Sequence, residues 1–376
     1  MREGSTGLAL LCEGLPLNLI SKYRNALFGV AILGILISHT RQFGLLFPAL
    51  GRNNIFQLLV SYGVVGVDMF LFLSGMGLFY SFSKDEKAYP FIKRRLSRIL
   101  PAVFIICGVI WGIRTLGVHN NIPAFLARIT LLRFWLKGAH QIWYVNLILL
   151  LYLLYPYLYH YLFDKEEGAL RRCIFLIVGV LLFNYALQVA YPEFWAWTRI
   201  AFTRIPVFVF GCYFGKLVYE RRRLPAQWIF VFALGLIAAF LLRFYMHEPF
   251  TIADSHDTLL HLLLGVGAVC ICYVLTTVFE LVSSLKASKA VFVFLNLFGV
   301  LSLEIFLSHI ILRDEVYKKY FMKGSGRIRE YLVVVLVSIV VAAAVHYAIE
   351  KWSQVYQKLK NRRRSPERDI GVTEDV

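Results

Sequence analysis

A histidine and two acidic residues lie inside otherwise apolar stretches of this 376-residue chain. His39 falls near the end of the first long apolar segment, NALFGVAILGILISHT, while Asp68 lies in VGVDMFLFLSG and Glu304 in SLEIFLSHI. Ionisable groups are costly in apolar surroundings, so a chain that keeps them there usually uses them. An imidazole takes a proton from a hydroxyl near neutral pH. His39 is therefore the candidate general base, with Asp68 or Glu304 as the carboxylate that orients it.

Other readings of these segments remain open. Asp68 also fits a hydrogen bond between two helices or a carboxylate at a membrane interface. His309 follows Glu304 by five residues, so one apolar segment carries two ionisable groups, and His309 is a further candidate. Ser74, which precedes Gly75, is a weaker candidate because small residues more often allow helices to approach closely.

Basic residues form a second constellation. Arg94, Arg95 and Arg98 lie in RRLSRILP, and Arg24 precedes the first apolar segment. Arginine holds phosphate with two donors at once, so these residues are candidates for binding a phosphorylated donor. Anionic lipid headgroups and membrane topology explain the cluster equally well. Arg24 lies fifteen residues before His39, about 22 Å along a helix, so the two can act together only through a ligand that spans the gap.

The segment HQIWYVNLILLLYLLYP adds three polar or amphipathic candidates. Trp143 and Tyr144 are typical of the aromatic belt at a membrane surface, and Asn146 is an amide that needs a partner inside a helix. The six cysteines are scattered, which fits neither a disulfide framework nor a zinc site, and we expect no metal site.

The composition identifies the surroundings of these residues. The chain is 59% hydrophobic and 17% charged, with a mean hydropathy of +0.65, and its apolar residues run in blocks of roughly twenty, the length of a membrane-spanning helix. This predicts an all-α, polytopic transmembrane bundle of about ten spans. Their approximate cores are 25–40, 57–80, 99–117, 142–163, 172–190, 201–219, 227–245, 258–282, 290–312 and 331–350.

The net charge of +17 is divided among many short loops, which favours a role in topology over nucleic-acid binding. An even number of spans, with the richer set of Lys and Arg on the side of the ends, places both termini in the cytoplasm. The expected division is an N-terminal cytoplasmic or interfacial segment at 1–23, a membrane domain at 24–352 and a basic cytoplasmic tail at 353–376, in which Lys358–Val376 should be disordered. The loop at 313–330 is the exception, since it carries basic residues on the outer side.

The order of these motifs resembles the integral-membrane acyltransferase family 3, which includes enzymes that O-acetylate bacterial envelope glycans. The resemblance rests on the segment ending in His39 and on VGVDMFLFLSG, RRLSRILP, HQIWYVNLILLLYLLYP, RIPVFVFGCYFG and SLEIFLSHI, in that order. It implies transfer of an acyl group, usually acetyl, from cytosolic acyl-coenzyme A to a hydroxyl, with His39 central. It also implies that Arg94, Arg95 and Arg98 face the coenzyme A phosphates. The family's arginine is often about eleven residues before the histidine, and Arg24 departs from that spacing.

The resulting hypothesis is a multi-pass acyltransferase of the bacterial inner membrane. Acyl-coenzyme A is its co-substrate, no cofactor stays bound, and its partners are a glycan or other hydroxyl acceptor and membrane lipid. His39 would act as a base or form an acyl-histidine. Two other classes fit the residues alone: a proton-coupled transporter or flippase of a lipid-linked sugar or small solute, and a sensor with a degenerate site. Consumption of the thioester separates the first hypothesis from the transporter.

Overall fold

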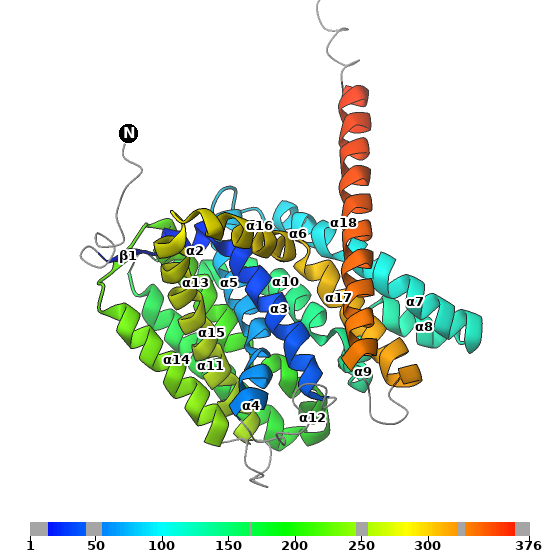
Figure 1. Ribbon diagram of the computed structural model, residues 1–376, viewed down its shortest axis with the longest axis horizontal. Helices are drawn as coiled ribbons and strands as arrows, with labels where there is room; N and C mark the ends of the chain where they lie inside the picture. The colour runs from blue at the N-terminus through cyan, green and yellow to red at the C-terminus, as the bar shows by residue number, and fades with distance from the viewer. Residues whose placement is uncertain (1–13, 43–54, 166, 246–254, 322–327, 365–376) are drawn as a thin grey trace, which may run out of the picture.

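The computed structural model describes residues 14–42, 55–165, 167–245, 255–321 and 328–364 (Figure 1). Within these ranges the chain is helical except for short connections and one pair of two-residue strands, β1 (Leu15–Pro16) and β2 (Arg223–Leu224), which pair antiparallel. The prediction of an all-α bundle is confirmed.

Eight helices of the described chain form the centre of the bundle. They are α2 (Asn18–Lys22), α3 (Arg24–Gln42), α4 (Ile55–Tyr62), α5 (Val65–Phe82), α13 (Ile205–Tyr219), α14 (Trp228–Tyr245), α15 (Ser255–Val282) and α16 (Lys286–Val300). α3 lies against both α5 and α16, and α5 also packs along α13 and α15. All but three residues of α5 are buried, as expected for a helix that is apolar on every face. α5 is therefore the core of the bundle.

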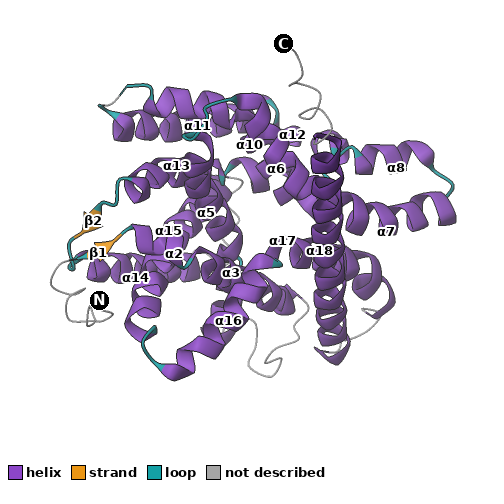
Figure 2. Cartoon of the chain, turned by 90° about the horizontal axis from the view of Figure 1, so that it is seen from above, coloured by secondary structure: helices purple, strands orange, loops and turns teal. Residues whose placement is uncertain are grey.

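The remaining helices surround this core. They are α6 (Ala88–Ala102), η2 (Val103–Cys107), α7 (Gly108–Gly112), η3 (Ile113–Val118), α8 (Ile122–Ile129), α9 (Leu132–Lys137), η4 (His140–Ile142), α10 (Trp143–Phe163), α11 (Ala169–Ala190), α12 (Pro192–Phe202), α17 (Ser302–Leu312), η5 (Arg313–Phe321) and α18 (Ile328–Arg364). Seen from above, α7 and α8 project from the bundle beside α18 (Figure 2). α11 and α18 expose most of their apolar surface, as helices facing lipid do.

The described residues contain seven helices long and apolar enough to cross a membrane, or eight if a bent pair counts as one span. α3 and α14 are shorter apolar helices. Each of the ten expected spans coincides with one of these helices or with the bent pair. A multi-pass membrane protein is supported, while the count of ten and the side of the termini stay predictions.

Three expectations about the C-terminal third are wrong. The segment 290–312 is not one straight span, because the chain bends by 65° between α16 and α17. The bend falls at Leu301, whose backbone is not helical. Two residues earlier, Gly299 packs against the backbone of Asn25 in α3. The expected loop at 313–330 begins as the π-helix η5, which continues α17.

The expected disordered tail is the third correction. α18 continues to Arg364, so residues 358–364 of the segment expected to be disordered are helical. Residues 365–376 lie outside the described ranges, as do 1–13 of the expected N-terminal segment. The exposed end of α18 extends beyond the bundle on the side where α6 and α16 lie (Figure 1). Residues with strong helix propensity, such as Gln, Lys and Leu, continue the last membrane helix into water.

Close packing of α5 against α13 depends on Gly75. A Cβ at this position would lie 2.5 Å from the carbonyl oxygen of Phe208 and 3.0 Å from the amide nitrogen of Cys212. Any larger residue would therefore push the two helices apart. In the pair Ser74–Gly75, Gly75 is therefore the residue that allows the two helices to approach closely.

Candidate active site

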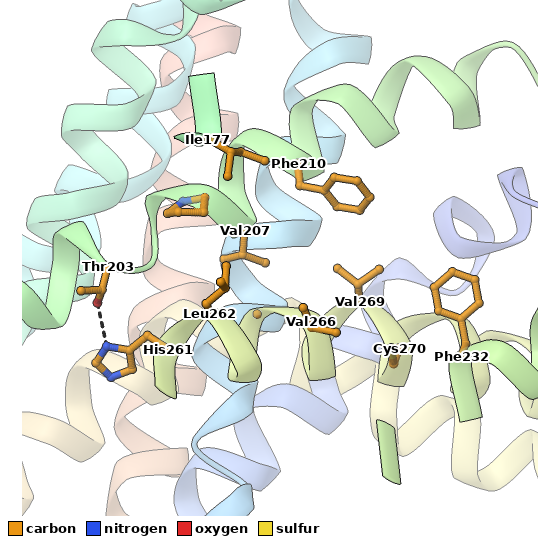
Figure 3. A pocket seen from close by; sticks show the side chains of 12 residues that line it. Ile177, Thr203, Val207, Phe210, Phe232, His261, Leu262, Val266, Val269 and Cys270 are labelled. Carbon is orange, nitrogen blue, oxygen red and sulfur yellow. Dashed lines mark hydrogen bonds between the residues drawn. The ribbon is translucent and has the colours of Figure 1, made fainter. Parts of the chain in front are cut away.

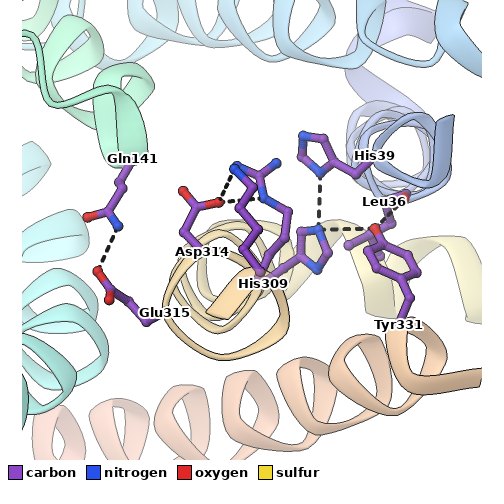
Figure 4. A network of polar contacts seen from close by, with 9 residues as sticks. Leu36, His39, Gln141, His309, Asp314, Glu315 and Tyr331 are labelled. Carbon is purple, nitrogen blue, oxygen red and sulfur yellow. Dashed lines mark hydrogen bonds and ion pairs between the residues drawn. The ribbon is translucent and has the colours of Figure 1, made fainter. Parts of the chain in front are cut away.

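His39 lies near one end of α3, and its partner comes from α17. His39 Nδ1 lies 3.0 Å from Nε2 of His309, and the two rings stack with their centroids 5.2 Å apart. Tyr331 of α18 places its hydroxyl 3.3 Å from the same His309 nitrogen and donates to the carbonyl of Leu36, one turn before His39 (Figure 4). Three helices thus fix the imidazole of His39.

The hydrogen-bond pattern defines how this pair can act. Tyr331 gives its one hydroxyl hydrogen to Leu36 and so does not donate to His309. For His39 Nε2 to accept a proton, the ring hydrogen of His39 must lie on Nδ1 and donate to His309 Nε2. His309 then carries its own hydrogen on Nδ1, a buried nitrogen without a hydrogen-bond partner in the described part of the chain. In this arrangement His309 orients the base and stabilises the imidazolium that forms.

The expectation that Asp68 or Glu304 orients His39 is wrong, because each carboxylate has another partner. Asp68 is fully buried and forms an ion pair with Nε of Arg204 at 3.3 Å. Glu304 accepts a hydrogen bond from Nδ1 of His346 at 2.9 Å. A buried carboxylate takes the nearest cation or donor, and here each partner comes from a distant part of the chain, 136 residues from Asp68 and 42 residues from Glu304.

A cavity of about 240 Å³ opens beside His39, and we call it the histidine cavity. Arg204 and Trp143 line it together, with the guanidinium of Arg204 5.0 Å from the centre of the Trp143 ring. Its full lining is Ile35, Ser38, His39, Val64, Val67, His140, Gln141, Trp143, Ile200, Arg204, Phe306, Ile310 and Arg313. The cavity can hold a polar molecule next to the proposed base.

A second cavity, of about 200 Å³, contains three of the predicted donor-binding residues, Arg24, Arg95 and Arg98. We call it the arginine cavity. Ser74 and Tyr144, two further predicted site residues, also line it. Its other lining residues are Asn25, Phe28, Ile35, Val67, Phe70, Ile99, Ile148, Tyr152, Gly299, Val300, Ser302, Leu303, Phe306 and His346. His39 and Arg24, at opposite ends of α3, thus line different cavities.

Two arginines of this cavity have unused donors. The buried Nε atoms of Arg24 and Arg95 have no hydrogen-bond partner among the described residues. Their guanidinium groups lie over aromatic rings instead, Arg24 over Phe28 at 4.9 Å and Arg95 over Tyr152 at 5.7 Å. Leaving a buried charged donor unpaired is costly, so this site is suited to an anion that supplies the missing acceptors.

The other predicted residues lie apart from this anion site. Arg94 is exposed, donates to the carbonyl of Ser81 at 3.5 Å, and is not among the described residues that line the arginine cavity. Asn146 donates to the carbonyl of Ile142 within its own helix and lines a separate cavity. In the described part of the chain, no group of three His, Cys, Asp or Glu side chains could hold a metal ion.

A further cavity, of about 310 Å³, is almost entirely apolar and lies between α11, α13, α14 and α15. Its polar end is the contact between Thr203 and Nδ1 of His261, at 2.6 Å (Figure 3). It contains none of the predicted site residues. It offers neither an anion site nor the His39 imidazole, so we assign it no part in the chemistry.

His309 is expected to support catalysis through His39. His309→Ala should lower kcat about 10²-fold and leave the KM for the donor unchanged, because it removes the acceptor of the His39 Nδ1 hydrogen. His309→Gln should recover part of the rate, since its side-chain oxygen can accept the same hydrogen. Initial rates at varied donor concentration provide both constants. Equal losses in the two variants, together with equal losses of thermal stability, would instead indicate a structural role.

Searches of curated proteins and of solved structures found no match. A family model, Acyl_transf_3, described as an acyltransferase domain, matches residues 25–347, a range that contains the whole lining of the histidine cavity and all of the arginine cavity except Arg24. Because this match covers most of the chain, the protein belongs to the Acyl_transf_3 family of membrane acyltransferases.

Proposed function

We propose that this acyltransferase moves an acyl group, most simply acetyl, from acyl-coenzyme A to a hydroxyl of an exported or cell-surface glycan. The observation that carries the proposal is the pair of buried, unpaired arginine donors in a cavity at the opposite end of α3 from the His39–His309 pair. A phosphorylated donor fits the arginine cavity, and a hydroxyl acceptor fits the histidine cavity.

The donor end matches coenzyme A in charge and in kind of contact. Its phosphates supply the acceptors that Arg24 and Arg95 lack, and Arg98 adds a third positive charge to the same cavity. Arginine is better suited to this than lysine because its planar fork holds two phosphate oxygens at once. The pantetheine arm would then run along α3 toward His39, which answers the need for a ligand that spans the distance between Arg24 and His39.

The acceptor end supplies the chemistry. His39 Nε2 takes the proton of the acceptor hydroxyl, and the alkoxide oxygen attacks the thioester carbon. The tetrahedral intermediate collapses with release of the coenzyme A thiolate, which receives the proton from the His39 imidazolium. A two-step route, in which His39 Nε2 itself takes the acyl group and then passes it to the hydroxyl, uses the same residues.

The proposal places the enzyme in the inner membrane of a bacterium, with the arginine cavity open to cytosolic acyl-coenzyme A and the histidine cavity on the side of the exported acceptor. The charge pattern of the loops supports this orientation. The end of α18, whose sequence is rich in Lys and Arg, extends on the side where α6 lies (Figure 1), and α6 carries Arg95 and Arg98 of the arginine cavity, which agrees with this orientation. Neither reactant is a resident cofactor, because both leave after each turnover.

Arg95→Ala should raise the KM for acetyl-coenzyme A by about 10- to 100-fold with little change in kcat, because it removes a charged hydrogen-bond donor from the anion site. Arg94→Ala is the matched control and should change the KM less than about 2-fold, since Arg94 is exposed outside the cavity. Thiol release kinetics and equilibrium binding of coenzyme A provide the two measurements. Equal effects of the two substitutions would contradict the placement of the donor.

A further inference from the structure

The two cavities meet at a shared apolar wall. Ile35 of α3, Val67 of α5 and Phe306 of α17 line both the arginine cavity and the histidine cavity. All three side chains are buried, with 2%, 6% and 6% of their surfaces exposed. Residues from three different helices thus separate the anion site from His39.

The wall lies one helical turn from the proposed base. Ile35 precedes His39 by four residues on α3, and Phe306 precedes His309 by three on α17. The distance of the wall from the anion site follows from the geometry of α3, since the eleven residues from Arg24 to Ile35 rise about 16 Å along the helix.

The length of the donor arm brings the thioester to this wall. The pantetheine arm has about twelve bonds between the phosphate oxygen and the sulfur. This is as many as the backbone of about four residues, so the extended arm is roughly 14 Å long. With the phosphates at Arg24, the sulfur therefore lies at the level of Ile35. The acyl group is the leading end of the donor, so it must pass between Ile35, Val67 and Phe306 to meet the acceptor hydroxyl at His39.

We propose that Phe306, with Ile35 and Val67, is the gate that selects the acyl group by its width. This inference rests on the proposed function. The ring of Phe306 is held by an edge contact with Tyr144 of α10, with the ring centres 5.5 Å apart. A straight, narrow acyl group such as acetyl passes beside it, whereas a branched group must displace the ring from this contact.

A competition assay tests the selectivity. Phe306→Ala and the milder Phe306→Leu should each shift the ratio of kcat/KM for isobutyryl- over acetyl-coenzyme A upward, by about 10-fold or more for alanine. Phe298→Ala is the matched control, because Phe298 is a partly buried phenylalanine of α16 that is absent from the described linings of both cavities. An unchanged ratio in both Phe306 variants overturns the selectivity role.

A second measurement does not depend on acyl transfer. Ser38 lines the histidine cavity and is buried, and the native cysteines at 107, 173, 212, 270 and 272 are buried too. A membrane-impermeant thiol reagent, added on the arginine-cavity side of vesicles, should label Ser38→Cys at least several-fold faster when Phe306→Ala is also present. Mass spectrometry would locate the label at residue 38.

The outcomes separate this inference from the proposed function. Faster labelling in the Phe306→Ala background supports the wall even if neither thioester is consumed. That combination of results would contradict the proposed function and leave the wall in place. If Ser38→Cys is labelled at the same rate with and without Phe306→Ala, the Phe306 ring does not block a path between the cavities. This result overturns the gate, regardless of the outcome of the transfer assay.

Discussion

His39→Ala is expected to lower kcat for acyl transfer by about 10²–10⁴-fold, the contribution of a positioned general base. The KM for acyl-coenzyme A should stay nearly constant, because the phosphates bind about 22 Å away at the other end of α3. Initial rates of thiol release from purified protein, with saturating acceptor, measure both constants.

Thr40→Ala is the matched control for this substitution. Thr40 is the next residue of α3, is buried, and bonds through its hydroxyl to the carbonyl of Ile37 within its own helix. Because it is absent from the described linings of both cavities, its loss should leave kcat within about 2-fold of the wild type. Comparable losses of rate in the two variants would mean that disturbance of α3, and not the imidazole, causes the effect.

Asp68→Ala should have the largest effect on stability, lowering the free energy of unfolding by about 3–5 kcal/mol. The reason is the ion pair with Arg204, in which the side chains are 0% and 3% exposed, so removing the carboxylate leaves a buried guanidinium without its counter-charge. Equilibrium unfolding in mixed detergent micelles measures the difference.

The double variant Asp68→Leu/Arg204→Met separates burial from function. Replacing both charges by apolar residues of similar size should restore most of the stability lost in Asp68→Ala. If activity stays low while stability returns, then the pair also serves the histidine cavity, which Arg204 lines. If Asp68→Ala unfolds at the same free energy as the wild type, then the buried ion pair does not stabilise the fold as argued here.

Hydropathy was sufficient to predict the helical segments because each expected span has to be apolar over its length. Hydropathy could not reveal the bend between α16 and α17, because an average over a window of residues carries no information on the direction of the helix axis. The bend arises where Gly299 meets the backbone of Asn25, a contact between residues far apart in the sequence. The helical continuation in η5 was missed for a related reason, because charged residues such as Asp314 and Lys318 bond to each other within the helix.

The candidate site divides in the same way. The cost of burying ionisable groups pointed to His39, Asp68, Glu304 and His309 one at a time. Their pairing could not be read from the chain, because the His39–His309 contact joins residues that are 270 positions apart. The same holds for the partners of the two acids, because Arg204 lies 136 residues from Asp68 and His346 lies 42 residues from Glu304.

Spacing along one helix was more informative. The separation of Arg24 and His39 indicated that they could cooperate only through an extended ligand, and the two residues do line separate cavities. The arginine cluster was less well resolved by sequence, because helical phase decides that Arg95 and Arg98 line the cavity while Arg94 lies outside it. The wall at Phe306 left no mark in the sequence, where it is one more apolar residue of α17.

The central claim is that the histidine pair and the arginine cavity are two ends of one acyl-transfer site. The most direct test follows label from acetyl-coenzyme A, radiolabelled in the acetyl group, into bacterial envelope extract in the presence of purified wild-type protein or His39→Ala. We predict that label passes to a hydroxyl compound, with release of coenzyme A, only with the wild-type protein. Label transfer at the same rate by His39→Ala would contradict the account.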